Sequence, residues 1–180
     1  MAKRHIPPIS SGRVRLRLLE EADLPTTLAW RNQDHIRRWF FRPEVITPGQ
    51  HREWWERYRE RDDDFVFVIE ETETLKRPVG QVALYNIDWE AGRAEFGRLM
   101  IGDNEMRGKG VARLATEQLL CAALGAWGLA EVYLEVLSAN TRAQRIYKVC
   151  GFTETSRRED SLVMTRRTPP DCGAGDEPKG

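Results

Sequence analysis

The segment from residue 107 to residue 112 combines glycines with cations in a pattern that can bind phosphate. It follows an apolar segment and opens a long helical pattern. Glycine lets the backbone approach a bulky anion, and the first free amides of a helix, together with its dipole, favour negative charge. The predicted phosphate-binding residues are Arg107, Gly108, Lys109, Gly110, Val111 and Ala112.

The spacing of this segment excludes two common nucleotide-binding loops. A Walker A loop needs four residues between its first glycine and a Gly-Lys pair, whereas five residues separate Gly102 from Gly108. A dinucleotide fingerprint needs a third glycine where Arg113 stands. An Arg-x-x-Gly-x-Ala pattern remains, and Asn140 and Tyr147 follow it seven residues apart, just after the next predicted strand.

Apolar periodicity predicts the elements that must position these residues. Predicted strands cover 13–19, 65–69, 79–87, 94–101, 131–137, 152–155 and 162–165, and predicted helices cover 21–32, 48–61, 111–128 and 141–150. Thr47 before Pro48 is typical of a helix start, Asn140 is a good cap, and Gly151 suits the left-handed residue that closes a helix. Hairpins followed by a strand-helix-strand crossover predict an α/β (α+β) domain with a mixed sheet.

Composition excludes several classes of function. The 180 residues carry 28 basic and 28 acidic side chains, so the net charge is zero. The chain therefore lacks the positive long-range electrostatic field that favours binding to nucleic acid or to an anionic membrane surface. Three distant cysteines and three histidines show neither disulfide nor metal-ligand spacing, which predicts no metal. No apolar run is long enough to cross a bilayer, and the start does not look like a signal peptide, so we expect a soluble cytoplasmic protein.

The chain divides into a domain with loose ends. We expect a flexible start over residues 1–12, one domain over 13–167 and a disordered tail over 168–180, which is rich in proline, glycine and charge.

The phosphate loop and the downstream segment 134–152, Leu-Glu-Val-Leu-Ser-Ala-Asn-Thr-Arg-Ala-Gln-Arg-Ile-Tyr-Lys-Val-Cys-Gly-Phe, resemble the GNAT acetyltransferase superfamily. The resemblance covers roughly 13–165. It implies a mixed, mostly antiparallel sheet of about six to seven strands with about four helices on its two faces. It also implies direct acetyl transfer from the cosubstrate acetyl-CoA to a primary amine.

The resemblance further implies a role for individual residues. The loop at 107–112 would hold the CoA pyrophosphate, and the backbone of Leu99, Met100 and Ile101 would pair with pantetheine. Asn140 would contact the cofactor arm, and Tyr147 would protonate the departing CoA thiolate. The stretch 101–107 is one residue longer than in many relatives, which could shift the pairing residues by one.

An attacking amine must first lose its proton, so a base is needed, directly or through water. Glu135 and Glu95, both on predicted strands, are the candidates. Each assignment has a structural alternative: Glu135 could be a solvated strand carboxylate, and Tyr147 shares a helical face with apolar residues and could be a core aromatic.

The acceptor pocket is expected between the first two helices, where aromatic and basic residues gather. These aromatics could equally pack the helices on the sheet. Among subfamilies, the chain most resembles amino-sugar N-acetyltransferases of the pseudaminic acid pathway, and then ribosomal-protein N-acetyltransferases. Aminoglycoside or polyamine acetylation, a non-catalytic acyl-CoA-binding module and a homodimer remain open. The predicted acceptor residues are Trp30, Arg31, Asn32, Trp39, Phe40 and Tyr85.

Overall fold

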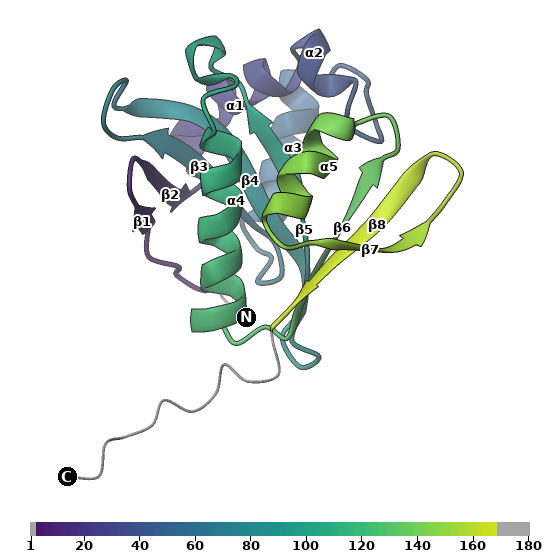
Figure 1. Ribbon diagram of the computed structural model, residues 1–180. Coiled ribbons are helices and arrows are strands. Elements are labelled where there is room, and N and C mark those ends of the chain that lie inside the picture. The colour runs from purple at the N-terminus through teal and green to yellow at the C-terminus, as the bar shows by residue number, and fades with distance from the viewer. Residues whose placement is uncertain (1–2, 169–180) are drawn as a thin grey trace, which may run out of the picture.

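One sheet of eight strands runs through the computed structural model, which describes residues 3–168 (Figure 1). Its order is β1-β2-β3-β4-β5-β6-β8-β7, and only the β5–β6 pair is parallel. The mixed, mostly antiparallel sheet is therefore confirmed, with one strand more than expected. The strands are β1 (Ile9–Ser11), β2 (Val14–Leu18), β3 (Phe65–Glu71), β4 (Arg77–Asp88), β5 (Arg93–Ile101), β6 (Glu131–Leu137), β7 (Thr153–Arg157) and β8 (Ser161–Arg167).

Helices cover both faces of this sheet. In Figure 1, α4 and α5 lie in front of it, and α1, α2 and α3 lie behind. The larger apolar core lies under α4 and α5, and a smaller one packs α1 and α3 against β3 and β4. The helices are η1 (Glu21–Asp23), α1 (Leu24–Arg31), α2 (Asp34–Arg37), α3 (Pro48–Tyr58), η2 (Asn104–Met106), α4 (Val111–Cys121), the π-helical η3 (Ala122–Ala126) and α5 (Thr141–Val149).

Local sequence accounts for the helix ends. Thr47 caps α3 in a capping box, accepting a hydrogen bond from the Gln50 amide at 3.2 Å, with Pro48 in the first turn. Asn140 caps α5, and Gly151 follows it with φ 87°. These predictions are confirmed. The single helix predicted over 111–128 is instead α4 followed by the π turn of η3.

Residues 3–11 pack on the domain, which differs from the flexible segment expected over 1–12. The Lys3 ammonium donates to the carbonyls of Tyr58 (3.1 Å) and Asp64 (2.6 Å), and burial lowers its pKa to about 8. Ile6 is buried, and β1 adds an edge strand. Of the tail predicted over 168–180, residues 169–180 lie outside the described part.

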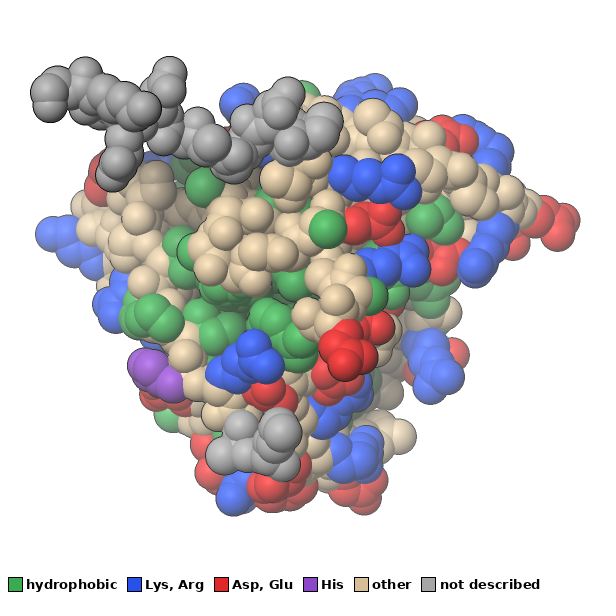
Figure 2. Space-filling view, turned by 90° about the horizontal axis from the view of Figure 1, so that it is seen from below, with side chains coloured by type: hydrophobic (Ala, Val, Ile, Leu, Met, Phe, Trp, Pro, Cys, Tyr) green, Lys and Arg blue, Asp and Glu red, His purple; other side chains and the backbone are tan. Residues whose placement is uncertain are grey.

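Charged side chains of both signs are interspersed on the face drawn in Figure 2. On the face seen from below, lysines and arginines alternate with acidic side chains around a group of hydrophobic ones (Figure 2). No field of one sign covers this face, in keeping with the zero net charge.

Strands β5 and β6 diverge soon after they begin. Their pairing covers only three residue pairs and ends at Glu95 opposite Tyr133. Beyond that point β5 stays paired with β4 and β6 with β8, so the edge of β5 over residues 96–101 faces no strand. We call this divergence the fork.

Candidate active site

The free edge of β5 can accept an extended ligand as if it were another strand. Its N–H and C=O groups over residues 96–101 lack a strand partner on the fork side. The register with β4 also shifts opposite Gln81 and Ala83, and Arg98 has φ 51°, which marks a β-bulge. Such a bulge turns backbone groups out of the regular ladder. The three predicted pantetheine-pairing residues, Leu99, Met100 and Ile101, end this edge.

The predicted phosphate loop follows β5 through η2. Gly108 and Gly110 have φ 75° and 81°, a conformation in which glycine is favoured, and Gly110 caps α4. The first helical hydrogen bond runs from the Leu114 amide to the Gly110 carbonyl at 3.1 Å. The amides of residues 111–113 therefore precede the helical ladder and are available to an anion.

Cations from three separate parts of the chain surround this loop. Arg107 and Lys109 belong to it, and within residues 3–168 neither forms an ion pair with a carboxylate. Arg13 donates to the Lys109 carbonyl, and the Arg142 guanidinium at the start of α5 lies 4.0 Å from where a Cβ on Gly108 would be. Sequence reasoning missed Arg13 and Arg142, because nothing local links them to the loop. The charge of these cations and the free amides at the start of α4 suit the binding of a pyrophosphate.

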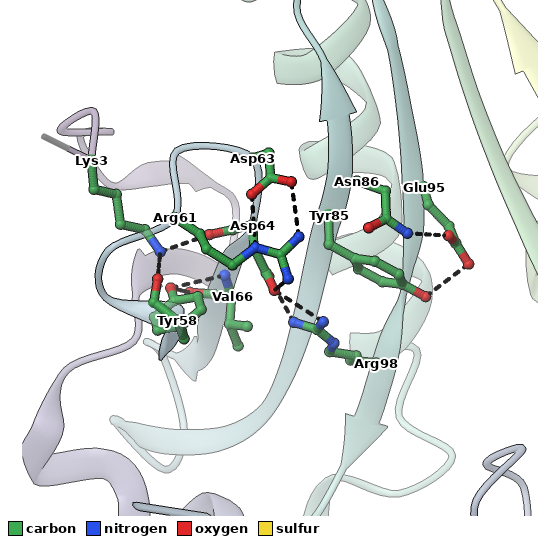
Figure 3. A network of polar contacts seen from close by, with 10 residues as sticks. All are labelled: Lys3, Tyr58, Arg61, Asp63, Asp64, Val66, Tyr85, Asn86, Glu95 and Arg98. Carbon is green, nitrogen blue, oxygen red and sulfur yellow. Dashed lines mark hydrogen bonds and ion pairs between the residues drawn. The ribbon is translucent and has the colours of Figure 1, made fainter. Parts of the chain in front are cut away.

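Glu95 lies at the fork with three donors around its carboxylate. It accepts from the Tyr85 hydroxyl at 3.0 Å, the Asn86 amide at 2.9 Å and the Tyr133 hydroxyl at 3.5 Å (Figure 3 draws the first two). Burial first, and then the charge of Glu95, raises the pKa of Tyr85 and of Tyr133. Both phenols therefore stay protonated and donate to the carboxylate.

Tyr147 packs on the opposite face of the sheet, against the residue that follows Glu95 in β5. Its ring contacts Phe96 and Phe152 edge-on, at centroid distances of 5.8 and 5.9 Å. Because successive residues of a strand point to opposite faces, Phe96 faces Tyr147 while Glu95 faces α1 and α3. Burial raises the pKa of Tyr147, so its phenol keeps its proton at neutral pH. Tyr147 is a core aromatic in its packing, which is compatible with an acid role.

The other two predicted polar residues have local partners. Glu135 accepts from the Ser161 hydroxyl at 2.5 Å and from Arg158 at 3.0 Å, so its carboxylate points toward β8 and away from β5. Asn140 accepts from the Ala143 amide at 3.2 Å as the cap of α5. The Glu95 carboxylate therefore lies where β5 and β6 separate, whereas Glu135, on β6 beyond that point, is held by groups of β8 and of the turn before it.

Trp30 packs α1 onto the end of β5. It is 8% exposed and forms a small cluster with Ile36 and Met100. A Cβ on Gly102 would overlap its indole ring, so the backbone of the strand end lies directly against Trp30. Trp30 therefore packs a helix on the sheet, which is the structural alternative that the sequence analysis gave for the aromatic residues.

The remaining acceptor candidates shape the loop after α2. Asn32 binds both backbone groups of Ile46, at 2.8 and 2.9 Å. The Arg31 guanidinium lies 4.1 Å from the centre of the Phe40 ring, while Trp39 is exposed. Of the six predicted acceptor residues, only Tyr85 contacts a predicted catalytic residue.

The sequence model of the acetyltransferase (GNAT) domain matches residues 13–153, which is most of the chain. The chain belongs to the GNAT acetyltransferase family. This acetyltransferase uses acetyl-CoA as the donor for N-acetylation. The glycine loop before α4 and the unpaired edge of β5 are features that suit this cofactor.

Individual relatives extend the comparison. The enzyme is 26% identical over 157 residues to spermidine N(1)-acetyltransferase of Vibrio cholerae, covering 87% of this chain and 88% of that one. It is 25% identical to the uncharacterized protein MJ1062 of Methanocaldococcus jannaschii, covering 84% of this chain and 31% of that longer one. The sequence predicted an amino-sugar or ribosomal-protein subfamily, and these relatives do not support that finer prediction: the one with a named activity acts on spermidine.

A solved structure agrees with the fold. The Vibrio cholerae spermidine N-acetyltransferase in complex with CoA and spermine has a TM-score of 0.77 and 26% identity, covering 86% of this chain and 95% of that one. In the acetyltransferase itself, no group of three or more His, Cys, Asp and Glu among residues 3–168 could hold a metal. No helix in the same range is long and apolar enough to cross a membrane.

Proposed function

We propose that this acetyltransferase moves the acetyl group of acetyl-CoA directly to a primary amine of a small molecule at the fork. The pyrophosphate binds the loop at 107–112, and pantetheine runs along the free edge of β5 past Leu99. The observation that carries the proposal is the end of the β5–β6 pairing at Glu95. A thioester lying there has Glu95 on one side of the sheet and Tyr147 on the other.

These groups support a complete acyl transfer. Glu95 takes the ammonium proton, directly or through water, and the freed amine attacks the thioester carbonyl carbon. A backbone amide of the bulged strand stabilises the oxyanion. The carbon–sulfur bond then breaks, and Tyr147 gives its proton to the leaving thiolate. The second proton of the attacking nitrogen returns to the Tyr147 phenolate through water, and Glu95 releases its proton to solvent, so the products are the neutral amide and the free thiol. No covalent intermediate on the protein is required.

Two acceptor classes each have a specific observation in their favour. The relatives with 26% identity act on spermidine, which favours a polyamine. The segment 31–44 carries four arginines against Asp34 and Glu44, and Arg38 and Arg42 are exposed. This excess of positive charge favours an amine that also bears an anionic group, such as an amino-sugar nucleotide.

A thiol-release assay with purified protein and acetyl-CoA tests this function. Its panel contains spermidine, spermine, amino-sugar nucleotides, aminoglycosides and peptides. We expect stoichiometric CoA thiol and acetylated amine with at least one small amine. Binding of acetyl-CoA without thiol release from any of them would leave a non-catalytic acyl-CoA module and contradict the proposal.

A further inference from the structure

Two side chains, Arg98 and Tyr85, connect the buried carboxylate of Asp64 beside β3 to Glu95. The Asp64 side chain is 2% exposed and accepts from both terminal nitrogens of Arg98, at 2.7 and 3.1 Å. The Arg98 guanidinium lies 4.3 Å from the centre of the Tyr85 ring. The Tyr85 hydroxyl in turn donates to Glu95 (Figure 3).

The backbone of β5 is shaped to allow this arrangement. Arg98 adopts φ 51°, a conformation that costs energy for a residue with a Cβ and that occurs often at functional sites. At the preceding Gly97, a Cβ would lie 2.7 Å from the Tyr85 hydroxyl oxygen. The phenol therefore crosses the strand where only glycine leaves it room, and it reaches Glu95 from there.

Stability alone gives a poor account of this chain of contacts. A buried ion pair often contributes little net stability compared with apolar residues of the same size. A left-handed arginine and an obligatory glycine add constraints that a packed sheet does not need. All of these features help to fix the position of the Tyr85 hydroxyl beside the Glu95 carboxylate.

We propose that Asp64 and Arg98 are positioning residues for acetyl transfer. They fix the ring of Tyr85, whose hydroxyl donates to one oxygen of Glu95 while Asn86 and Tyr133 contact the other, and so they hold the carboxylate in one orientation at the fork. The inference rests on the proposed function, in which Glu95 accepts the amine proton. Correct orientation of such a base supplies rate without changing cofactor binding.

A double-variant cycle tests the proposal. Tyr85→Phe keeps the ring between Gly97 and Arg98 but removes the hydroxyl, and we expect kcat to fall about tenfold with an unchanged KM for acetyl-CoA. Arg98→Lys keeps the charge but loses the flat, bidentate guanidinium, and kcat falls by a similar factor. Because Arg98 acts through Tyr85, we expect the kcat of the double variant to fall about tenfold rather than about a hundredfold.

Arg61→Gln is the matched control. Arg61 lies 4.0 Å from the Asp64 carboxylate and pairs with the partly exposed Asp63, and among the described residues it forms no hydrogen bond with Tyr85 and does not stack on its ring. We expect its kcat to equal that of the wild type, and thermal unfolding of every variant checks that it folds.

Two results would overturn the inference alone while the wild type turns over normally. One is a wild-type kcat in Tyr85→Phe or Arg98→Lys, and the other is a hundredfold loss in the double variant, which would mean independent roles. A wild type that releases no thiol with any amine would overturn the proposed function together with this inference.

Discussion

The ring and the hydroxyl of Tyr147 have separable roles. The ring packs against Phe96 and Phe152 in the core, and the hydroxyl is the proposed acid. Tyr147→Phe keeps the packing, so we expect wild-type acetyl-CoA affinity by calorimetry and a kcat about a hundredfold lower, in the range that a general acid contributes. An unchanged kcat would show that Tyr147 is a core aromatic only.

Glu95 and Glu135 form a natural pair of variants, because both are carboxylates on strands that border the fork. Glu95→Gln removes the proposed base, and we expect kcat to fall about a hundredfold or more at saturating substrates. Glu135→Gln affects only contacts with Ser161 and Arg158, and we expect kcat to stay within about twofold of the wild type. The reverse order in steady-state kinetics would make Glu135 the base.

At the scale of elements, Gly102 determines how closely α1 packs on the end of β5. Gly102→Ala places a methyl group in the indole ring of Trp30, and overpacking of this kind costs about 1–3 kcal/mol. We expect Tm to fall by about 2–12 °C in calorimetry. Gly125→Ala is the control: its methyl group enters open space in a helical turn, so Tm should stay the same or rise. Equal Tm values for both variants would contradict this packing.

The elements that sequence reasoning predicted are those with a clear apolar period or a local cap, such as α3 and α5. β1 has three residues and α2 has four, too few for any period to emerge. The glycines before α4 and the Asn140 cap are local signals, and the structure confirms the helix starts that they predicted. The fork is a property of strand register, so the choice between Glu95 and Glu135 could not be made from residue types. The contact of Asp64 with Arg98 spans 34 residues and left no local pattern.

At the scale of the whole molecule, the sheet consists of two parts that share few hydrogen bonds. β1 to β5 form one part and β6, β8 and β7 the other, and three residue pairs join them. A cofactor in the fork adds contacts across this joint. At a hundred times its Kd, a ligand stabilises the fold by about 2.7 kcal/mol, which raises Tm by about 5–10 °C.

Hydrogen exchange with two ligands can locate this stabilisation. CoA carries pantetheine, whereas 3′,5′-ADP carries adenosine phosphates without it. We expect CoA to slow amide exchange in the first turn of α4 and along residues 99–101 of β5, because pantetheine amides pair with that edge. With 3′,5′-ADP the slowing should be confined to the loop at 107–112 and the start of α4. Identical protection by both ligands would mean that the cofactor arm does not lie in the fork, since an arm bound elsewhere leaves this edge exposed to solvent.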